Sequence, residues 1–199
     1  MLKQITVAAA VLVAATPALG ADSGGQFRVR GVGVGTCQQF LDAVDKKDNA
    51  LYLFGGWLDG YLTGVNQFSP ETFDIAPWES TETLASLVRA NCAKNPKQNF
   101  HAMLNAMVTV LRDRRLQERS TVVTATVGDQ SIKLYKDVLS QMQAALAKSG
   151  FDPGAQDGTF GDQTRSAIEA YQKDKGFKVT GLPDQITLLS LLLPIGESE

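Results

Sequence analysis

The stretch DGTFGDQTRSAIEAYQ, residues 157 to 172, places two aspartates around a glycine-bearing turn that runs into a helical apolar pattern. After the turn, Ala167, Ile168 and Tyr171 recur at the spacing of one helical face. Asp162 stands where an N-cap belongs, since its carboxylate can accept hydrogen bonds from the free amides of a first helical turn. The turn could therefore hold a metal ion, supply a catalytic carboxylate, or only begin a helix.

A calcium site is not expected at this turn. Calcium loops bring several oxygen ligands together at close spacing and end with a late glutamate. Asp152, Asp157 and Asp162 are five residues apart, and no such glutamate follows them. The sequence therefore predicts no metal site and no cofactor, and we interpret the acidic turn as architecture.

Helical apolar spacing continues on both sides of the turn. Upstream, from Lys133 onward, one helical face carries four apolar residues: Val138, Met142, Ala145 and Leu146. Gly150 follows as a left-handed helix end. Downstream, Asp184 can cap a third, leucine-rich helix. Three short helices joined by tight turns in about 60 residues predict a small bundle.

The run from Leu139 to Leu192 resembles the three-helix peptidoglycan-binding domain found beside bacterial wall hydrolases. The family pattern is Q-x-x-L, then glycine and an aromatic residue, then D-G-x-F-G-x-x-T-x-x-A-[VI]-x-x-[FY]-Q, then T-G-x-x-D-x-x-T-x-x-x-L. The matching residues are Gln143, Leu146, Gly150, Phe151, Asp157, Gly158, Phe160, Gly161, Thr164, Ala167, Ile168, Tyr171, Gln172, Gly176, Thr180, Gly181, Asp184, Thr187 and Leu191. The departures are Tyr171 in place of the commoner phenylalanine and an enlarged FDPGAQDG turn.

This resemblance implies a bundle fold and peptidoglycan as the ligand. Most matching positions are caps, turns and core, so the resemblance defines the fold better than it defines a binding surface. The polar turns carry groups that can hydrogen-bond glycan or peptide. We take four residues as candidate ligand-binding residues: Asp157, Phe160, Thr164 and Arg165.

The N-terminus has the features of a secretory signal peptide. Lys3 precedes an uncharged run from Ile5 to Leu19, which at about 15 residues is shorter than the ~20 residues of a membrane-spanning helix. The Ala-Leu-Gly triplet at 18–20 suits signal peptidase. We therefore predict a cleaved signal over residues 1–20, a periplasmic protein, and no membrane span after signal removal.

The charge balance argues against nucleic acid as a partner. The chain has 19 lysines and arginines against 21 aspartates and glutamates, a formal net charge of −2. Proteins that bind nucleic acid concentrate positive charge on one face. The arginine-rich run at 112–119 follows a predicted helix, where cations interact favourably with the negative helix end. We expect no nucleic-acid partner.

Cys37 and Cys92 are the two cysteines of the chain. An exported protein with an even number of cysteines usually pairs them, so we favour a disulfide. The alternative is a thiolate nucleophile, which would need a depressed pKa and a partner base.

The cysteine segments, 35–61 and 84–104, are similar to those of small periplasmic helical proteins of the acid-stress chaperone (HdeA-like) type. In that family the cysteines form one disulfide between helices, which supports pairing Cys37 with Cys92. The type VI immunity proteins have a comparable layout and are the second possibility. The glycine-rich helix and the Trp78 loop are not obvious in the HdeA-like pattern, so chaperone activity is not carried over from the resemblance.

The predicted fold class is mainly α, with a minor β ribbon. Strand-like patterns at 26–35 and 121–127 are expected to pair and frame the N-terminal helices. The predicted layout is a signal peptide at 1–20, a disulfide-bonded helical domain at 21–127, a linker at 128–132 and a peptidoglycan-binding-like domain at 133–195.

One predicted helix, 49–68, contains Gly56, Gly60 and Gly64 at intervals of four. Each glycine inside a helix costs about 1 kcal/mol relative to alanine. The sequence therefore predicts that another backbone packs along the glycine stripe, while the aromatic residues of this helix pack elsewhere.

No known catalytic site is recognisable in the sequence. Zinc peptidases and amidases of the wall generally use at least two histidines as ligands, and this chain has only His101. We therefore predict no catalytic residues and no enzyme. The alternative is a muramidase or transglycosylase in residues 22–120, because a glycosidase needs only two carboxylates.

The resulting functional prediction is an exported, non-catalytic peptidoglycan-binding protein. Its C-terminal bundle would dock to the wall, and its N-terminal domain would interact with another periplasmic protein or act like a chaperone. An alternative prediction is a sugar-stacking surface formed by Trp57, Tyr61 and Trp78. For Trp57 and Tyr61, packing in the core is the favoured prediction.

Overall fold

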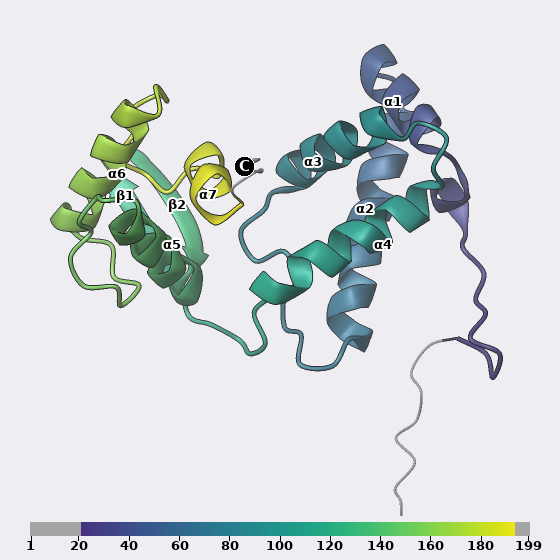
Figure 1. Ribbon diagram of the computed structural model, residues 1–199, viewed down its shortest axis with the longest axis horizontal. Coiled ribbons are helices and arrows are strands. Elements are labelled where there is room, and N and C mark those ends of the chain that lie inside the picture. The colour runs from purple at the N-terminus through teal and green to yellow at the C-terminus, as the bar shows by residue number, and fades with distance from the viewer. Residues whose placement is uncertain (1–20, 194–199) are drawn as a thin grey trace, which may run out of the picture.

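The computed structural model describes residues 21–193, so the predicted signal peptide at 1–20 lies outside the described residues. The described chain is mainly helical, as predicted, with one two-stranded sheet. Figure 1 shows two lobes, with α1 to α4 in one and the sheet with α5 to α7 in the other. The elements are η1 Gly31–Val34, α1 Cys37–Lys46, α2 Ala50–Phe68, α3 Thr81–Lys94, α4 Phe100–Leu111, η2 Arg112–Arg114, β1 Val122–Val127, β2 Gln130–Tyr135, α5 Lys136–Lys148, α6 Asp162–Asp174 and α7 Gln185–Leu192.

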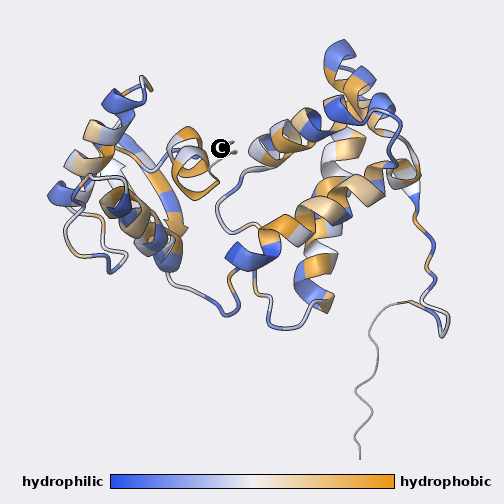
Figure 2. Cartoon of the chain, in the orientation of Figure 1, coloured by the Kyte–Doolittle hydropathy of each residue, from blue (hydrophilic) through white to orange (hydrophobic). Residues whose placement is uncertain are grey.

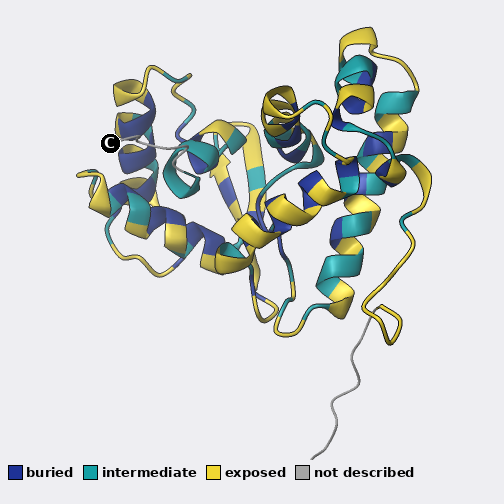
Figure 3. Ribbon diagram, turned by 45° about the vertical axis from the view of Figure 1, so that its right-hand side comes forward, coloured by how far each residue is buried: buried dark blue, intermediate teal, exposed yellow. Residues whose placement is uncertain are grey.

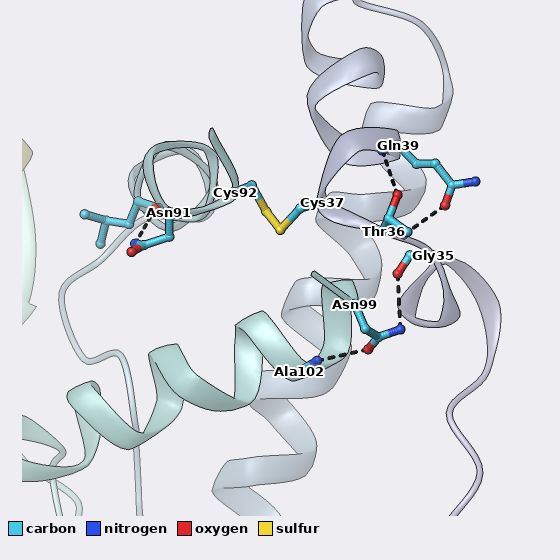
Figure 4. Close-up of a disulfide and its surroundings, with 9 residues drawn as sticks. Gly35, Thr36, Cys37, Gln39, Asn91, Cys92, Asn99 and Ala102 are labelled. Carbon is cyan, nitrogen blue, oxygen red and sulfur yellow. Dashed lines mark hydrogen bonds between the residues drawn. A yellow bond between two sulfur atoms is a disulfide. The ribbon is translucent and has the colours of Figure 1, made fainter. Parts of the chain in front are cut away.

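The N-terminal core is an aromatic cluster tied by a disulfide. Phe54 of α2 meets Phe100 of α4 edge to face, with ring centroids 4.8 Å apart, and Phe40 of α1 lies 5.3 Å from Phe100. Cys37 and Cys92, both fully buried, are bonded and join α1 to α3 across 4.9 Å between their Cα atoms (Figure 4). The predicted disulfide is confirmed. Buried residues lie on the inner side of each helix and exposed residues on the outer side (Figure 3).

Side-chain caps explain where these helices begin. Ser80 accepts a hydrogen bond from the Thr83 amide at the start of α3. Asn99 accepts from the Ala102 amide at the start of α4 and donates to the Gly35 carbonyl (Figure 4). Asn99 therefore both caps α4 and holds the segment that precedes α1.

The predicted pairing of two distant strands is wrong. Residues 31–34 form the short helix η1, in which Gly33 lies so close to the ring of Trp57 that a Cβ atom would collide with it. Strand β1 instead pairs with β2, and Val127 lies opposite Gln130 across a turn in which Gly128 has a φ of +57°. The predicted linker at 128–132 is therefore part of a hairpin.

The glycine stripe of α2 also differs from expectation. Within the described residues, no heavy atom lies within 4 Å of the position that a Cβ would take at Gly56, Gly60 or Gly64. The stripe lies at the surface, and no backbone packs along it. The buried side of α2 consists of Phe54, Leu58 and Leu62.

The C-terminal bundle packs against the hairpin. Ala125 of β1 and Leu134 of β2 are buried in one core with α5, α6 and α7. Asp184 caps α7 by accepting from the Thr187 amide, as predicted. Asp162 does not cap α6: the N-cap is Gly161, and the carboxylate of Asp162 lies 3.8 Å from Arg165.

The two lobes are joined by a clasp formed by Gln185, the first residue of α7, and the segment between α2 and α3. The Gln185 side chain donates to the Trp78 carbonyl at 2.6 Å and accepts from the Ser80 amide and the Thr83 hydroxyl. The Trp78 ring is 8% exposed and packs in the C-terminal core. A residue from the N-terminal half therefore completes the core of the other lobe.

Loss of the disulfide should destabilise the N-terminal lobe. The bond closes a loop with a sequence separation of 55, for which the chain-entropy relation gives about 4 kcal/mol. We expect Cys37→Ala/Cys92→Ala to lower the free energy of unfolding by about that amount in urea titrations followed by circular dichroism. A midpoint equal to that of the unmodified protein would contradict this expectation.

Candidate functional site

The C-terminal bundle has a groove of about 670 Å³ where the ends of α5 and α6 meet α7. Its position follows from the bundle: two helices end there and the third crosses beside them. The lining residues are Ala145, Lys148, Ser149, Tyr171, Lys175, Phe177, Ile186, Leu189, Ser190, Leu191 and Leu193. We call this the bundle groove.

Tyr171 is held firmly in the wall of the bundle groove. Its hydroxyl and that of Ser190 are 2.6 Å apart and hydrogen-bonded. Phe151 and Phe177 pack edge to face against the Tyr171 ring, at centroid distances of 5.4 and 6.5 Å. The ring is 3% exposed, so the groove presents a rigid aromatic wall rather than a free stacking platform.

The charge of the bundle groove is positive. Lys148 and Lys175 line it, and no aspartate or glutamate is among its described lining residues. The Lys175 ammonium lies 5.6 Å from the Tyr171 ring centroid and 3.3 Å from a carboxylate oxygen of Asp174. Lysines beside apolar side chains and serine hydroxyls suit a ligand that combines carboxylates, hydroxyls and apolar groups.

The predicted ligand residues lie at the other end of α6. Asp157 is exposed and accepts from the Thr159 amide at 2.8 Å, and this backbone hydrogen bond lowers the pKa of the Asp157 carboxyl. Phe160 is partly buried against the C-terminal core. Arg165 lies 3.5 Å from Glu169, one turn along the helix. None of these residues lines the bundle groove.

Thr164 has a structural role in the turn that precedes α6. It is 3% exposed, and its hydroxyl donates to the Pro153 carbonyl and accepts from the Gln143 side-chain amide at 2.9 Å. Gln143, fully buried, also accepts from the Gly158 amide. Ligand contact at Thr164 stays a prediction, and in the described structure the hydroxyl is already hydrogen-bonded within the chain.

Sequence reasoning missed the residues that line the bundle groove. Tyr171 belongs to the family pattern, but its apolar spacing indicated only a core position. Lys175 follows Tyr171 by one helical turn, so the spacing along α6 could have indicated it. Ser190 carries no local signal, since only the packing of α7 against α6 brings it to Tyr171.

Glu79, which lies outside the bundle groove, has a strongly raised pKa. Burial raises its pKa to about 7, against the opposing effects of backbone hydrogen bonds and of Arg114. Burial likewise lowers the pKa of Arg114, whose guanidinium donates to the Leu192 carbonyl at 2.7 Å. Glu79 follows Trp78 directly, so it lies in the segment that joins the two lobes.

Residues 21–193 contain neither a membrane-spanning helix nor a cluster of metal-ligating side chains. No helix in this range is both long and apolar enough to cross a membrane. In the same range, no three or more histidine, cysteine, aspartate or glutamate side chains gather in a way that could hold a metal ion.

The bundle is similar to a known family of domains. Residues 136–191 match the family model described as "Putative peptidoglycan binding domain". The N-acetylmuramoyl-L-alanine amidase CwlM of Mycobacterium tuberculosis is 41% identical over 58 residues, which are 29% of this chain and 14% of the amidase. The C-terminal part of the prediction is thereby supported, and the match favours association with the cell wall.

Two solved structures of SltB3 from Pseudomonas aeruginosa, in complex with NAG-anhNAM-pentapeptide and with NAG-NAM-pentapeptide, are 27% and 28% identical to the chain. Each alignment covers 52% of this chain and 26% of SltB3, with a TM-score of 0.29. A TM-score of this size does not establish a common fold. The chain spans 14% of the amidase and 26% of SltB3. The HdeA-like resemblance of the N-terminal segments stays a prediction.

The prediction that the chain is not an enzyme is contradicted by these matches. The curated relative that shares the bundle is named an amidase, which is a cell-wall hydrolase. The single histidine argued only against a zinc site with two or more histidine ligands. It did not test catalysis by a pair of carboxylates. We therefore withdraw the assignment of a non-enzyme.

A substitution at Thr164 tests its structural role. Thr164→Val removes the hydroxyl that serves the Gln143 amide and the Pro153 carbonyl, and a buried polar group left unpaired costs about 1–3 kcal/mol. We expect that loss in urea unfolding of the full chain. Thr164→Ser should retain most of the stability, and exposed Ser166→Ala should change it little. Equal stability of Thr164→Val and the parent protein would show that the buried hydroxyl is dispensable.

Proposed function

We propose that this protein binds peptidoglycan through its C-terminal bundle, with the bundle groove as the contact site. The family match over residues 136–191 carries the proposal, because it covers α5 and α6 and nearly all of α7, which together build the groove. The ligand class is a wall fragment that carries sugar hydroxyls and carboxylates.

The groove chemistry supports this ligand class. Lys148 and Lys175 can each pair with a carboxylate, while Ser149 and the Tyr171–Ser190 hydroxyl pair can exchange hydrogen bonds with sugar hydroxyls. Because the lysines are exposed, each pair adds modest energy and mainly orients the ligand.

The periplasm is the proposed location, because a wall-binding domain and the predicted signal at 1–20 agree on export. For the N-terminal lobe we propose an interaction with another periplasmic protein. Its disulfide suits an oxidising compartment.

Hydrolysis of the wall is a second candidate function. It is favoured by the amidase relative and by Glu79, whose pKa near 7 would keep a useful fraction of the acid protonated at neutral pH. A protonated carboxyl of this kind can donate a proton to a leaving group. Glu79 lies within the region 22–120 in which the sequence left a hydrolase open.

Charge reversal in the bundle groove should weaken wall binding. We expect Lys148→Glu/Lys175→Glu to reduce co-sedimentation of the full chain with purified sacculi by about tenfold in affinity, because two attractive contacts become repulsive. Lys173→Glu/Lys178→Glu makes the same charge change outside the groove and should bind like the parent protein. Equal binding by both double variants would remove the groove from the proposal.

If Glu79 acts as an acid, wall hydrolysis should depend on its proton. Activity on wall-embedded gels should fall as the pH rises through about 7, since the raised pKa means that Glu79 loses its proton there. Glu79→Gln, which cannot donate a carboxylic proton, should abolish the cleared band while wall binding persists. A band of full strength from Glu79→Gln would exclude this acid from the reaction.

A further inference from the structure

A second groove, of about 340 Å³, lies between α3 and α4. Its floor is apolar and consists of Leu87 from α3 with Met103, Met107 and Val110 from α4. Figure 2 shows that α4 is apolar along most of its length and that the η2 turn after it is hydrophilic. Val110 is 61% exposed, so part of this apolar surface faces solvent.

The two ends of the second groove are positively charged. Arg114 lines it at the end of α4. At the start of α4, Asn95 and Gln98 line both this groove and an adjoining hollow that contains Lys94 and Lys97. No aspartate or glutamate is among the described residues that line either hollow, although the whole chain carries a net charge of −2. The surface therefore complements an anionic ligand.

The length of α4 beside the groove matches a short extended peptide. The 12 residues of α4 span about 18 Å at the helical rise, which is the length of roughly five residues of extended chain. The side chains of Asn95 and Gln98 can donate to and accept from a peptide backbone, which an apolar groove alone could not satisfy. The methionines supply adaptable apolar contact for the ligand's aliphatic groups.

The second groove and the bundle groove share one lining residue. Leu193 lines both, and Arg114 holds the neighbouring Leu192 carbonyl. The clasp formed by Gln185 and the Trp78 segment keeps the two lobes in this arrangement. A ligand lying in the bundle groove can therefore extend past Leu193 onto α3 and α4.

We propose that the α3–α4 groove binds the stem peptide of a wall fragment whose glycan part lies in the bundle groove. The proposal rests on the proposed function, and it adds a peptide-specific site on the N-terminal lobe. The carboxylates of the peptide pair with Arg114 at one end and with Lys94 and Lys97 at the other, and its aliphatic side chains lie on the methionine floor.

Methionine methyl signals offer a direct test in the full chain. Met103 and Met107 line the groove, although only 3% and 9% of their surface is exposed, whereas Met142 lies in the core of the other lobe and serves as an internal control. Titration with the free stem tetrapeptide, released from sacculi, should shift the ¹³C methyl signals of Met103 and Met107 and leave Met142 unchanged. Peptide-free glycan should not shift Met103 or Met107.

A second test compares charge-reversal variants beside the α3–α4 groove with matched variants outside both grooves. Lys94→Glu/Lys97→Glu should weaken tetrapeptide binding by about tenfold and make the remaining binding less sensitive to salt. Lys133→Glu/Lys173→Glu carries the same charge change outside both grooves and should bind normally.

Two outcomes would overturn the proposal. One is tetrapeptide binding that leaves Met103 and Met107 unshifted or that survives Lys94→Glu/Lys97→Glu. The other is binding that emerges only after deletion of residues 194–199, which would assign the groove to the chain's own end. Co-sedimentation with sacculi and with peptide-free glycan would persist in either case, so failure of this inference is distinguishable from failure of the proposed function.

Discussion

The side chain of Gln185 joins the first turn of α7 to the segment between α2 and α3, and the relation between the two lobes depends on it. One carboxamide serves the carbonyl of Trp78, the amide of Ser80 and the hydroxyl of Thr83. The Trp78 ring fills part of the C-terminal core, and breaking this clasp would leave part-buried polar groups beside it unpaired. The same contact aligns the two grooves that meet at Leu193.

Within the bundle, two fully buried glutamines perform the equivalent task. Gln143 holds the turn before α6, and Gln172 accepts from the amides of Thr180 and Gly181 in the turn before α7. A buried carboxamide with satisfied donors and acceptors fixes a loop that has little apolar surface of its own. The most recognisable residues of the family pattern are therefore those that shape the turns, and the groove lies where the helices end.

The location of the groove changes how the acidic turn should be understood. Asp157 caps its own turn and Thr164 is enclosed by it, so the polar character of this stretch serves folding. The positive charge in the proposed wall-binding groove comes instead from Lys148 and Lys175, at the opposite ends of α5 and α6. A motif that is rich in polar residues is thus a poor guide to a binding surface when those residues already bond to the backbone.

Local chemistry allowed much of the fold to be predicted from the sequence. The helical periodicity around Ile168, the cap at Asp184 and the pairing of Cys37 with Cys92 depend on neighbours along the chain or on a count of residue types. The hairpin was misassigned because the alternation in residues 130–135 is weak next to an apolar helix. The raised pKa of Glu79, the clasp at Gln185 and the two grooves could not be predicted, because burial and contacts between residues about 100 positions apart are properties of tertiary packing and leave no periodic signal in the sequence.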